Sequence, residues 1–111
     1  MELAKKYTAD FYSQIQQQKF KDASKLFGTE ISQEEGIIML NSINDLRGGI
    51  IDAVTDRVGT VVITSNGVIS DVECTVELNC IYEKGKTFEV IVLKGKNFET
   101  LKVVGYEFAL K

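Results

Sequence analysis

Histidine, proline and tryptophan are all absent from this chain of 111 residues, and cysteine and methionine occur only twice each. Without histidine, the chain lacks the one side chain whose unperturbed pKa lies near neutral pH. The lack of proline favours long, uninterrupted β-strands, because proline cannot donate a hydrogen bond to a neighbouring strand. The sequence also lacks a phosphate-binding loop, a nucleophile motif and a metal-ligand cluster, so no motif assigns a catalytic chemistry.

Charge of either sign is scattered rather than clustered. The chain has 13 basic and 16 acidic residues, a net charge of −3, and no run of Lys or Arg longer than two. This pattern lacks the basic surface that binds nucleic acid or an anionic membrane. No stretch approaches the roughly 20 apolar residues of a membrane span. We therefore expect one domain over residues 1–111, with no nucleic-acid partner, no membrane span, no metal and no cofactor.

The first six residues, Met1 to Lys6, do not fix the cellular location. The segment has no apolar core of a signal peptide, so a cytoplasmic start is the default expectation. It is equally compatible with a start that follows a removed export or lipoprotein signal, and both alternatives stay open.

The two cysteines, Cys74 and Cys80, lie six residues apart on one predicted strand. An extended strand rises roughly 3.3 Å per residue, which separates them by about 20 Å. A disulfide needs Cα atoms within about 7 Å, so the two cannot bridge each other. We interpret them as small buried hydrophobic residues.

Everything before Gly48-Gly49 has the three- and four-residue apolar spacing of helices. The first predicted helix spans residues 2–18, and a short second helix begins near Phe20 and ends at Gly28. The third begins at the capping box Ser32-Gln33-Glu34-Glu35 and ends at Gly48-Gly49. The apolar faces of the three helices are formed by Leu3, Ala4, Tyr7, Phe11, Tyr12 and Ile15; by Phe20, Ala23, Leu26 and Phe27; and by Met39, Leu40, Ile43 and Leu46.

Everything after Gly48-Gly49 has the pattern of β-strands, predicted over residues 50–64, 68–82, 87–93 and 98–110. Asn66-Gly67 is a strong signal for a hairpin turn. The second strand alternates almost perfectly, and its apolar face consists of Val68, Val72, Cys74, Val76, Leu78, Cys80 and Tyr82. In the last strand the apolar phase shifts at Val103-Val104, which predicts a β-bulge that curves the sheet. Helices followed by strands indicate an α+β domain, with three helices packed on a curved antiparallel sheet of four or more strands.

This order resembles the nuclear-transport-factor-2-like superfamily, whose cone-like, cystatin-like roll includes ketosteroid isomerase, scytalone dehydratase and SnoaL-like proteins. Two segments carry the resemblance: Phe11-Tyr12 followed by residues 19–27 near the start, and Lys102-Val103-Val104-Gly105-Tyr106-Glu107-Phe108 at the end. The resemblance implies a pocket between the helices and the concave face of the sheet. It also implies a homodimer through the outer face of the sheet. The residues expected to line the pocket are Tyr7, Phe11, Tyr12, Phe27, Cys74, Val76, Leu78 and Tyr106.

Two functions are compatible with the predicted fold and its implied pocket. The favoured one is a non-enzymatic binding or interaction domain that holds a small apolar ligand, because the inward face of strand 68–82 carries no carboxylate. The alternative is an isomerase or lyase of the ketosteroid-isomerase type, with Asp52 or Asp56 as the base and Tyr12 or Tyr106 as the hydrogen-bond donor. That alternative requires a carboxylate and a tyrosine hydroxyl to converge in the pocket.

Overall fold

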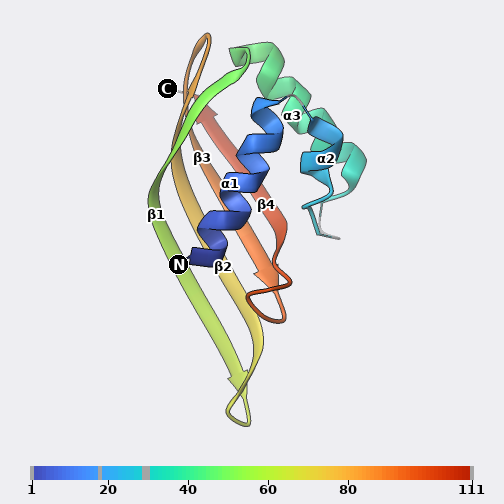
Figure 1. The fold of residues 1–111 in the computed structure, drawn as a ribbon, viewed down its shortest axis with the longest axis vertical. Coiled ribbons are helices and arrows are strands. Elements are labelled where there is room, and N and C mark those ends of the chain that lie inside the picture. The colour runs from blue at the N-terminus through green and yellow to red at the C-terminus, as the bar shows by residue number, and fades with distance from the viewer. Residues whose placement is uncertain (1, 18, 29–30, 111) are drawn as a thin grey trace.

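A computed structural model describes residues 2–17, 19–28 and 31–110 of the chain. Three helices, α1 (Glu2–Gln16), α2 (Phe20–Ser24) and α3 (Gln33–Arg47), precede all of the strands (Figure 1). The strands are β1 (Ile50–Ser65), β2 (Val68–Tyr82), β3 (Gly85–Gly95) and β4 (Lys102–Leu110). The predicted α+β order is confirmed. The predicted end of the first helix at residue 18 lies outside the described residues.

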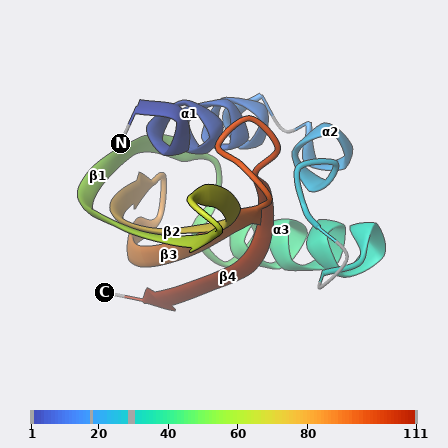
Figure 2. The ribbon, with the colours of Figure 1, turned by 90° about the horizontal axis from the view of Figure 1, so that it is seen from below.

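The four strands form one antiparallel sheet in the order β1-β2-β3-β4. Asn66 and Gly67 both have positive φ, 54° and 79°, as the predicted two-residue hairpin turn requires. Between β3 and β4 the register passes from Leu93–Val103 to Val92–Gly105, so Val104 is an extra residue and the predicted bulge is confirmed. The sheet curls strongly, with α1 over its concave side and α3 beyond the β4 edge (Figure 2).

The core lies between α1 and α3 and the inward face of the sheet. Phe11 is its aromatic centre, with ring centroids 5.4–5.7 Å from those of Tyr12, Phe27 and Tyr106. The inward residues of β2 from Val72 to Tyr82 are buried, as their alternation predicts. Both cysteines are buried and free. Two predicted apolar positions are exposed instead, because Leu46 lies on the outer side of α3 and Val68 lies at the hairpin turn.

Both predicted ends of α3 are confirmed. The Ser32 hydroxyl accepts a hydrogen bond from the Glu35 amide at 3.1 Å. At the other end, Gly48 adopts a φ of 76°, where glycine carries no steric penalty. Within the helix, Gly36 lies directly against Phe27, and a Cβ built on Gly36 would come 1.9 Å from that ring. The contact explains why a glycine occupies a helix interior.

Several predicted boundaries are wrong. Strand β3 extends two residues beyond each predicted end, from Gly85 to Gly95. Helix α2 ends at Ser24 rather than at Gly28, because the chain turns there to run beside β4. The Gly28 amide donates to the Val103 carbonyl, and the Val103 amide donates to the Leu26 carbonyl, both at 2.7 Å. Strand β4 begins at Lys102 rather than at Phe98, because the Asn97 side chain accepts from the Glu99 amide and holds the preceding residues in a turn.

Candidate functional site

A fully buried carboxylate occupies the middle of the core. Glu89 is 0% exposed and lies on β3, in the same inward-facing row as Thr87, Ile91 and Leu93. A buried carboxylate needs hydrogen-bond partners to compensate for the loss of water.

Four hydroxyl groups supply those partners. Glu89 Oε1 accepts from Tyr12 at 2.6 Å and from Tyr106. Glu89 Oε2 accepts from Tyr82 at 2.5 Å and from Thr87 at 2.5 Å. The four donors fill the four lone-pair positions that a carboxylate offers. Because they come from α1, β2, β3 and β4, this hydroxyl cluster ties the first helix to three strands.

Burial keeps the surrounding groups protonated. Desolvation, and then the neighbouring Tyr106 and Glu89, raise the pKa of Tyr12 well above its usual value. Desolvation and the Glu89 charge raise the pKa of Tyr106 and Tyr82 in the same direction. Burial beside Glu89 raises the pKa of Cys80 to about 12. At neutral pH these groups are therefore uncharged, and the three phenols serve as hydrogen-bond donors to one carboxylate.

The space next to this cluster is small. A void of about 10 Å³ borders Tyr82 and Tyr106 between α1, α3 and the sheet. That volume holds about one water molecule. The cluster is therefore arranged to satisfy its own hydrogen bonds, and every hydroxyl in it is already directed at Glu89.

The residues predicted to line a pocket are largely core residues. All of them are buried except Tyr7, which is half-buried and donates to the Glu99 carbonyl at 2.6 Å; the buried ones are Phe11, Tyr12, Phe27, Cys74, Val76, Leu78 and Tyr106. Asp52 and Asp56 are exposed on β1. The structure thus brings Tyr12 and Tyr106 together at a carboxylate, but that carboxylate belongs to Glu89 and not to either aspartate.

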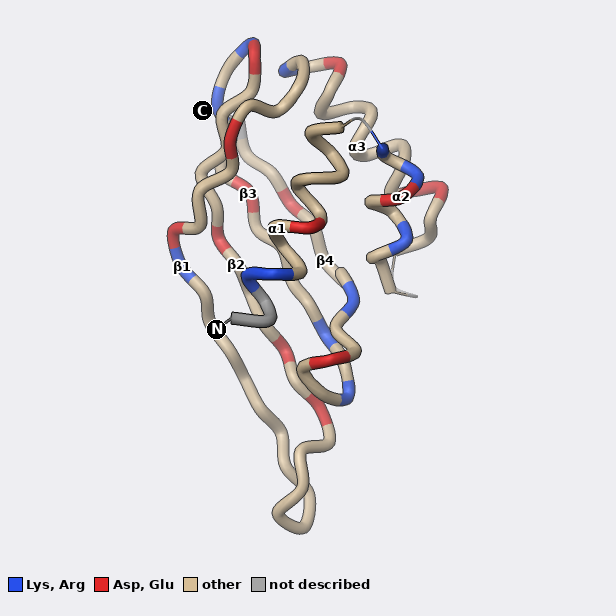
Figure 3. Tube along the Cα trace, viewed as in Figure 1, with Lys and Arg blue, Asp and Glu red and all other residues tan. Residues whose placement is uncertain are grey.

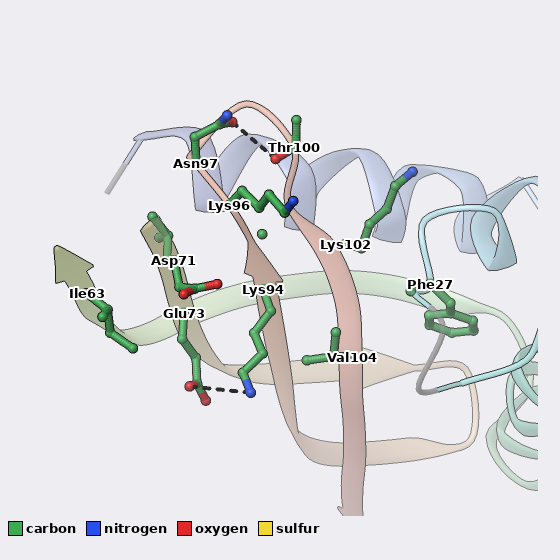
Figure 4. A pocket seen from close by; sticks show the side chains of 13 residues that line it. Phe27, Ile63, Asp71, Glu73, Lys94, Lys96, Asn97, Thr100, Lys102 and Val104 are labelled. Atoms are coloured by element: carbon green, nitrogen blue, oxygen red, sulfur yellow. Dashed lines mark hydrogen bonds and ion pairs between the residues drawn. The ribbon is translucent and has the colours of Figure 1, made fainter. Parts of the chain in front are cut away.

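A much larger concavity lies on the outer face of the sheet, near the end that carries the β3–β4 loop (Figure 4). This outer groove has a volume of about 900 Å³. Its apolar border consists of Ile63 and Val104 together with the buried core residues Phe27 and Val72, and its charged side chains are Asp71, Glu73, Lys94, Lys96 and Lys102. The groove therefore combines an apolar surface with an excess of positive charge.

The charges of the outer groove are only partly paired. Lys94 points toward Glu73 (Figure 4), with 4.0 Å between Nζ and Oε2. Among the described residues, the ion pairs involve neither Lys96 nor Lys102. Two ammonium groups at the groove are therefore available to a negatively charged ligand.

Other kinds of site find no support in the described part of the chain. No three His, Cys, Asp or Glu side chains there gather closely enough to hold a metal ion. Within residues 2–17, 19–28 and 31–110, every helix is too short or too polar to cross a membrane. Comparison with protein-family models, curated proteins and solved structures finds no match.

Neither Glu89 nor the outer groove was predicted from the sequence. A signal for Glu89 was present, because it alternates in phase with Thr87, Ile91 and Leu93, all of which face inward. The groove had no comparable signal, since its residues come from five separate segments of the chain.

Proposed function

We propose that this chain is a non-enzymatic binding domain that holds a small, mainly apolar ligand with one negatively charged group in the outer groove. The observation that carries this proposal is the groove itself: about 900 Å³ in volume, lined by apolar side chains and bordered by Lys96 and Lys102. Binding sites for small molecules are typically concave and mainly apolar, with a few polar groups that fix orientation. Within this proposal the fold is a cone-like roll of the nuclear-transport-factor-2-like kind.

The outer groove is favoured over the interior because of volume and hydrogen bonding. The void beside Tyr82 and Tyr106 is about 10 Å³, and the nearby hydroxyls already donate to Glu89. The interior ligand cavity stays a prediction, and it would require the packing of α1 and α3 against the sheet to open. The groove needs no such rearrangement.

Thermal unfolding with matched probes tests the proposal. A ligand that binds only the folded chain raises its melting temperature. Decanoate should stabilise the protein more than 1-decanol, since the two share most of their alkyl chain but only decanoate carries a charge. Replacing two groove lysines together, Lys96→Gln and Lys102→Gln, should weaken decanoate binding about tenfold, as expected for the loss of a charge-assisted contact.

The control variant is Lys86→Gln, at the opposite end of β3 and also exposed. It should leave decanoate binding unchanged. Equal stabilisation by decanoate and 1-decanol, or equal weakening in Lys86→Gln, would contradict the proposed groove site.

A second candidate function rests on the convergence of Glu89 with Tyr12 and Tyr106. A carboxylate beside phenol donors is the constellation that proton transfer next to a carbonyl requires. In this alternative, an isomerase or lyase of the ketosteroid-isomerase type, Glu89 takes the role predicted for Asp52 or Asp56. Incubating the protein with a cyclic enolisable ketone in deuterium oxide tests it. Exchange of the α-protons that is lost in Glu89→Gln and kept in Asp52→Asn would support the enzyme over the binding domain.

The predicted homodimer through the outer face of the sheet stays a prediction, as an alternative to ligand binding in the outer groove. Half-buried Val90 and Val92 on that face support it. Glu77 and Glu107, paired across from Val90, bring negative charge to the same area. A dimer that used this whole face would also cover the outer groove, so ligand binding and face-to-face dimerisation would compete.

A further inference from the structure

The β1–β2 hairpin carries the most unusual surface of the molecule. Residues 58–70, here called the hairpin arm, contain no charged residue (Figure 3). The arm projects beyond the rest of the sheet (Figure 1), and its β-branched residues are exposed: Val61 by 58%, Ile63 by 54% and Val68 by 67%. Large apolar side chains in such numbers on one surface segment indicate an interaction site.

The arm also presents an unprotected strand edge. Strand β1 is the end strand of the sheet, so one of its edges has no strand partner among the described residues. From Arg57 to Ile63 it pairs with β2 residue by residue, without a bulge. Natural proteins usually protect exposed edges with lysine, proline, bulges or very short strands. Between residues 58 and 63 this edge has none of these features, and the register shift between Ile63 and Thr64 arises from the extra residue Ser70 on β2.

We propose that this edge binds a second copy of the same chain, the two arms pairing as antiparallel strands about a two-fold axis at Val61. Such an axis places Val61 opposite Val61 of the partner subunit, and Gly59 opposite Ile63 of the partner subunit. Arg57 then faces an uncharged serine of the other arm, so no like charges oppose each other. The result is a continuous eight-stranded antiparallel sheet.

The absence of charged residues from the hairpin arm favours a second copy of the chain as its binding partner. An edge that recognises a different protein commonly uses charge complementarity to choose it, whereas an uncharged, apolar edge pairs with itself without repulsion. A two-fold contact occupies the β1 edge of each of the two copies. No free β1 edge remains, so assembly stops at a dimer. Of the residues that line the outer groove, this contact involves Ile63 alone, whereas a dimer through the face of the sheet would cover the groove.

The size of the contact predicts a dimer of modest affinity. Nine paired residues, from Arg57 to Ser65, extend about 26 Å along the strand, since they are eight steps of roughly 3.3 Å apart. A contact of that length falls below a standard interface of about 800 Å² per partner. We therefore expect the mass measured by light scattering to rise from monomer to dimer as the protein concentration increases.

Two matched lysine variants locate the interface. Val61→Lys puts like charges opposite each other at the two-fold axis, while Glu73, paired with Val61 across β1–β2, can accommodate the new ammonium within one chain. Val90→Lys makes the same change on the outer face, between Glu77 and Glu107. Val61→Lys should raise the dissociation constant about tenfold or more, and Val90→Lys should leave it nearly unchanged.

A cysteine variant tests the register independently of charge. Directly opposed residues in an antiparallel pair have Cα atoms about 4.5–5.5 Å apart, which a disulfide can span. Val61→Cys should therefore form a covalent dimer under mild oxidation, while Val90→Cys should not. The native Cys74 and Cys80 do not interfere, because both are buried.

Three outcomes would overturn the proposal. They are a wild-type protein that stays monomeric at every concentration, a dimer that Val90→Lys dissociates and Val61→Lys does not, and assembly that grows past the dimer without limit. Circular dichroism of each variant confirms that the comparison is made between folded chains.

Discussion

Replacing Glu89 should show that the hydroxyl cluster depends on its acceptor. In Glu89→Leu the hydroxyls of Tyr12, Tyr82, Tyr106 and Thr87 lose their common partner in a fully buried site. Each unsatisfied buried hydroxyl costs about 1–3 kcal/mol. Allowing for some rearrangement, we expect a loss of about 4 kcal/mol or more, out of a typical stability of about 5–15 kcal/mol.

The same reasoning predicts that further substitutions restore stability. Adding Tyr12→Phe, Tyr82→Phe and Tyr106→Phe to Glu89→Leu removes three of the orphaned hydroxyls, and an apolar replacement of a buried polar group of similar shape is often nearly neutral. Urea unfolding followed by circular dichroism measures both variants. The quadruple variant should be more stable than Glu89→Leu alone. A loss below about 1 kcal/mol in Glu89→Leu, or a quadruple variant less stable than it, would refute the reasoning.

Three further predictions concern the buried tyrosines, the two cysteines and two glycines. Burial raises the pKa of three tyrosines above the ordinary value of about 10. As the pH rises, their phenol groups therefore lose their protons at a lower pH in the unfolded chain than in the folded chain. Stability should therefore fall as the pH rises above about 10, and tyrosinate absorbance should appear together with the loss of circular dichroism. Both cysteines should resist a thiol reagent in the folded protein and react on unfolding, given their burial and the raised pKa of Cys80. Gly36→Ala should destabilise the protein by about 1–3 kcal/mol through the clash with Phe27, whereas Gly59→Ala, with open space around it, should be nearly neutral in thermal unfolding.

Local signals in the sequence were enough to predict most of the fold. The N-cap at Ser32, the turn at Asn66-Gly67 and the phase shift at Val104 each depend on short-range geometry, and each is confirmed. The wrong boundaries at Gly28 and Phe98 have a different origin. Both segments are shaped by contacts with residues distant in sequence or by a side chain in a turn, which local apolar spacing does not record.

The candidate site was harder to predict for the same reason. Tyr12 and Tyr106, which were predicted as site residues, are buried in the core, but their shared partner Glu89 was not predicted. A glutamate is almost never fully buried unless it is paired, so the inward phase of Glu89 on β3 does not by itself predict burial. The four donors that make its burial acceptable come from separate elements, and only the assembled fold brings them together.

The proposed binding function is tested most directly by mapping the ligand in solution. Backbone amide chemical shifts, recorded while decanoate is added to the isotopically labelled protein, report which residues the ligand contacts. We predict saturable shifts at residues 71–73, 94–97 and 100–104, which border the outer groove, with little change around Glu89. Shifts centred on Tyr82, Glu89 and Tyr106, or no saturable shifts at all, would contradict the assignment of the outer groove as the binding site.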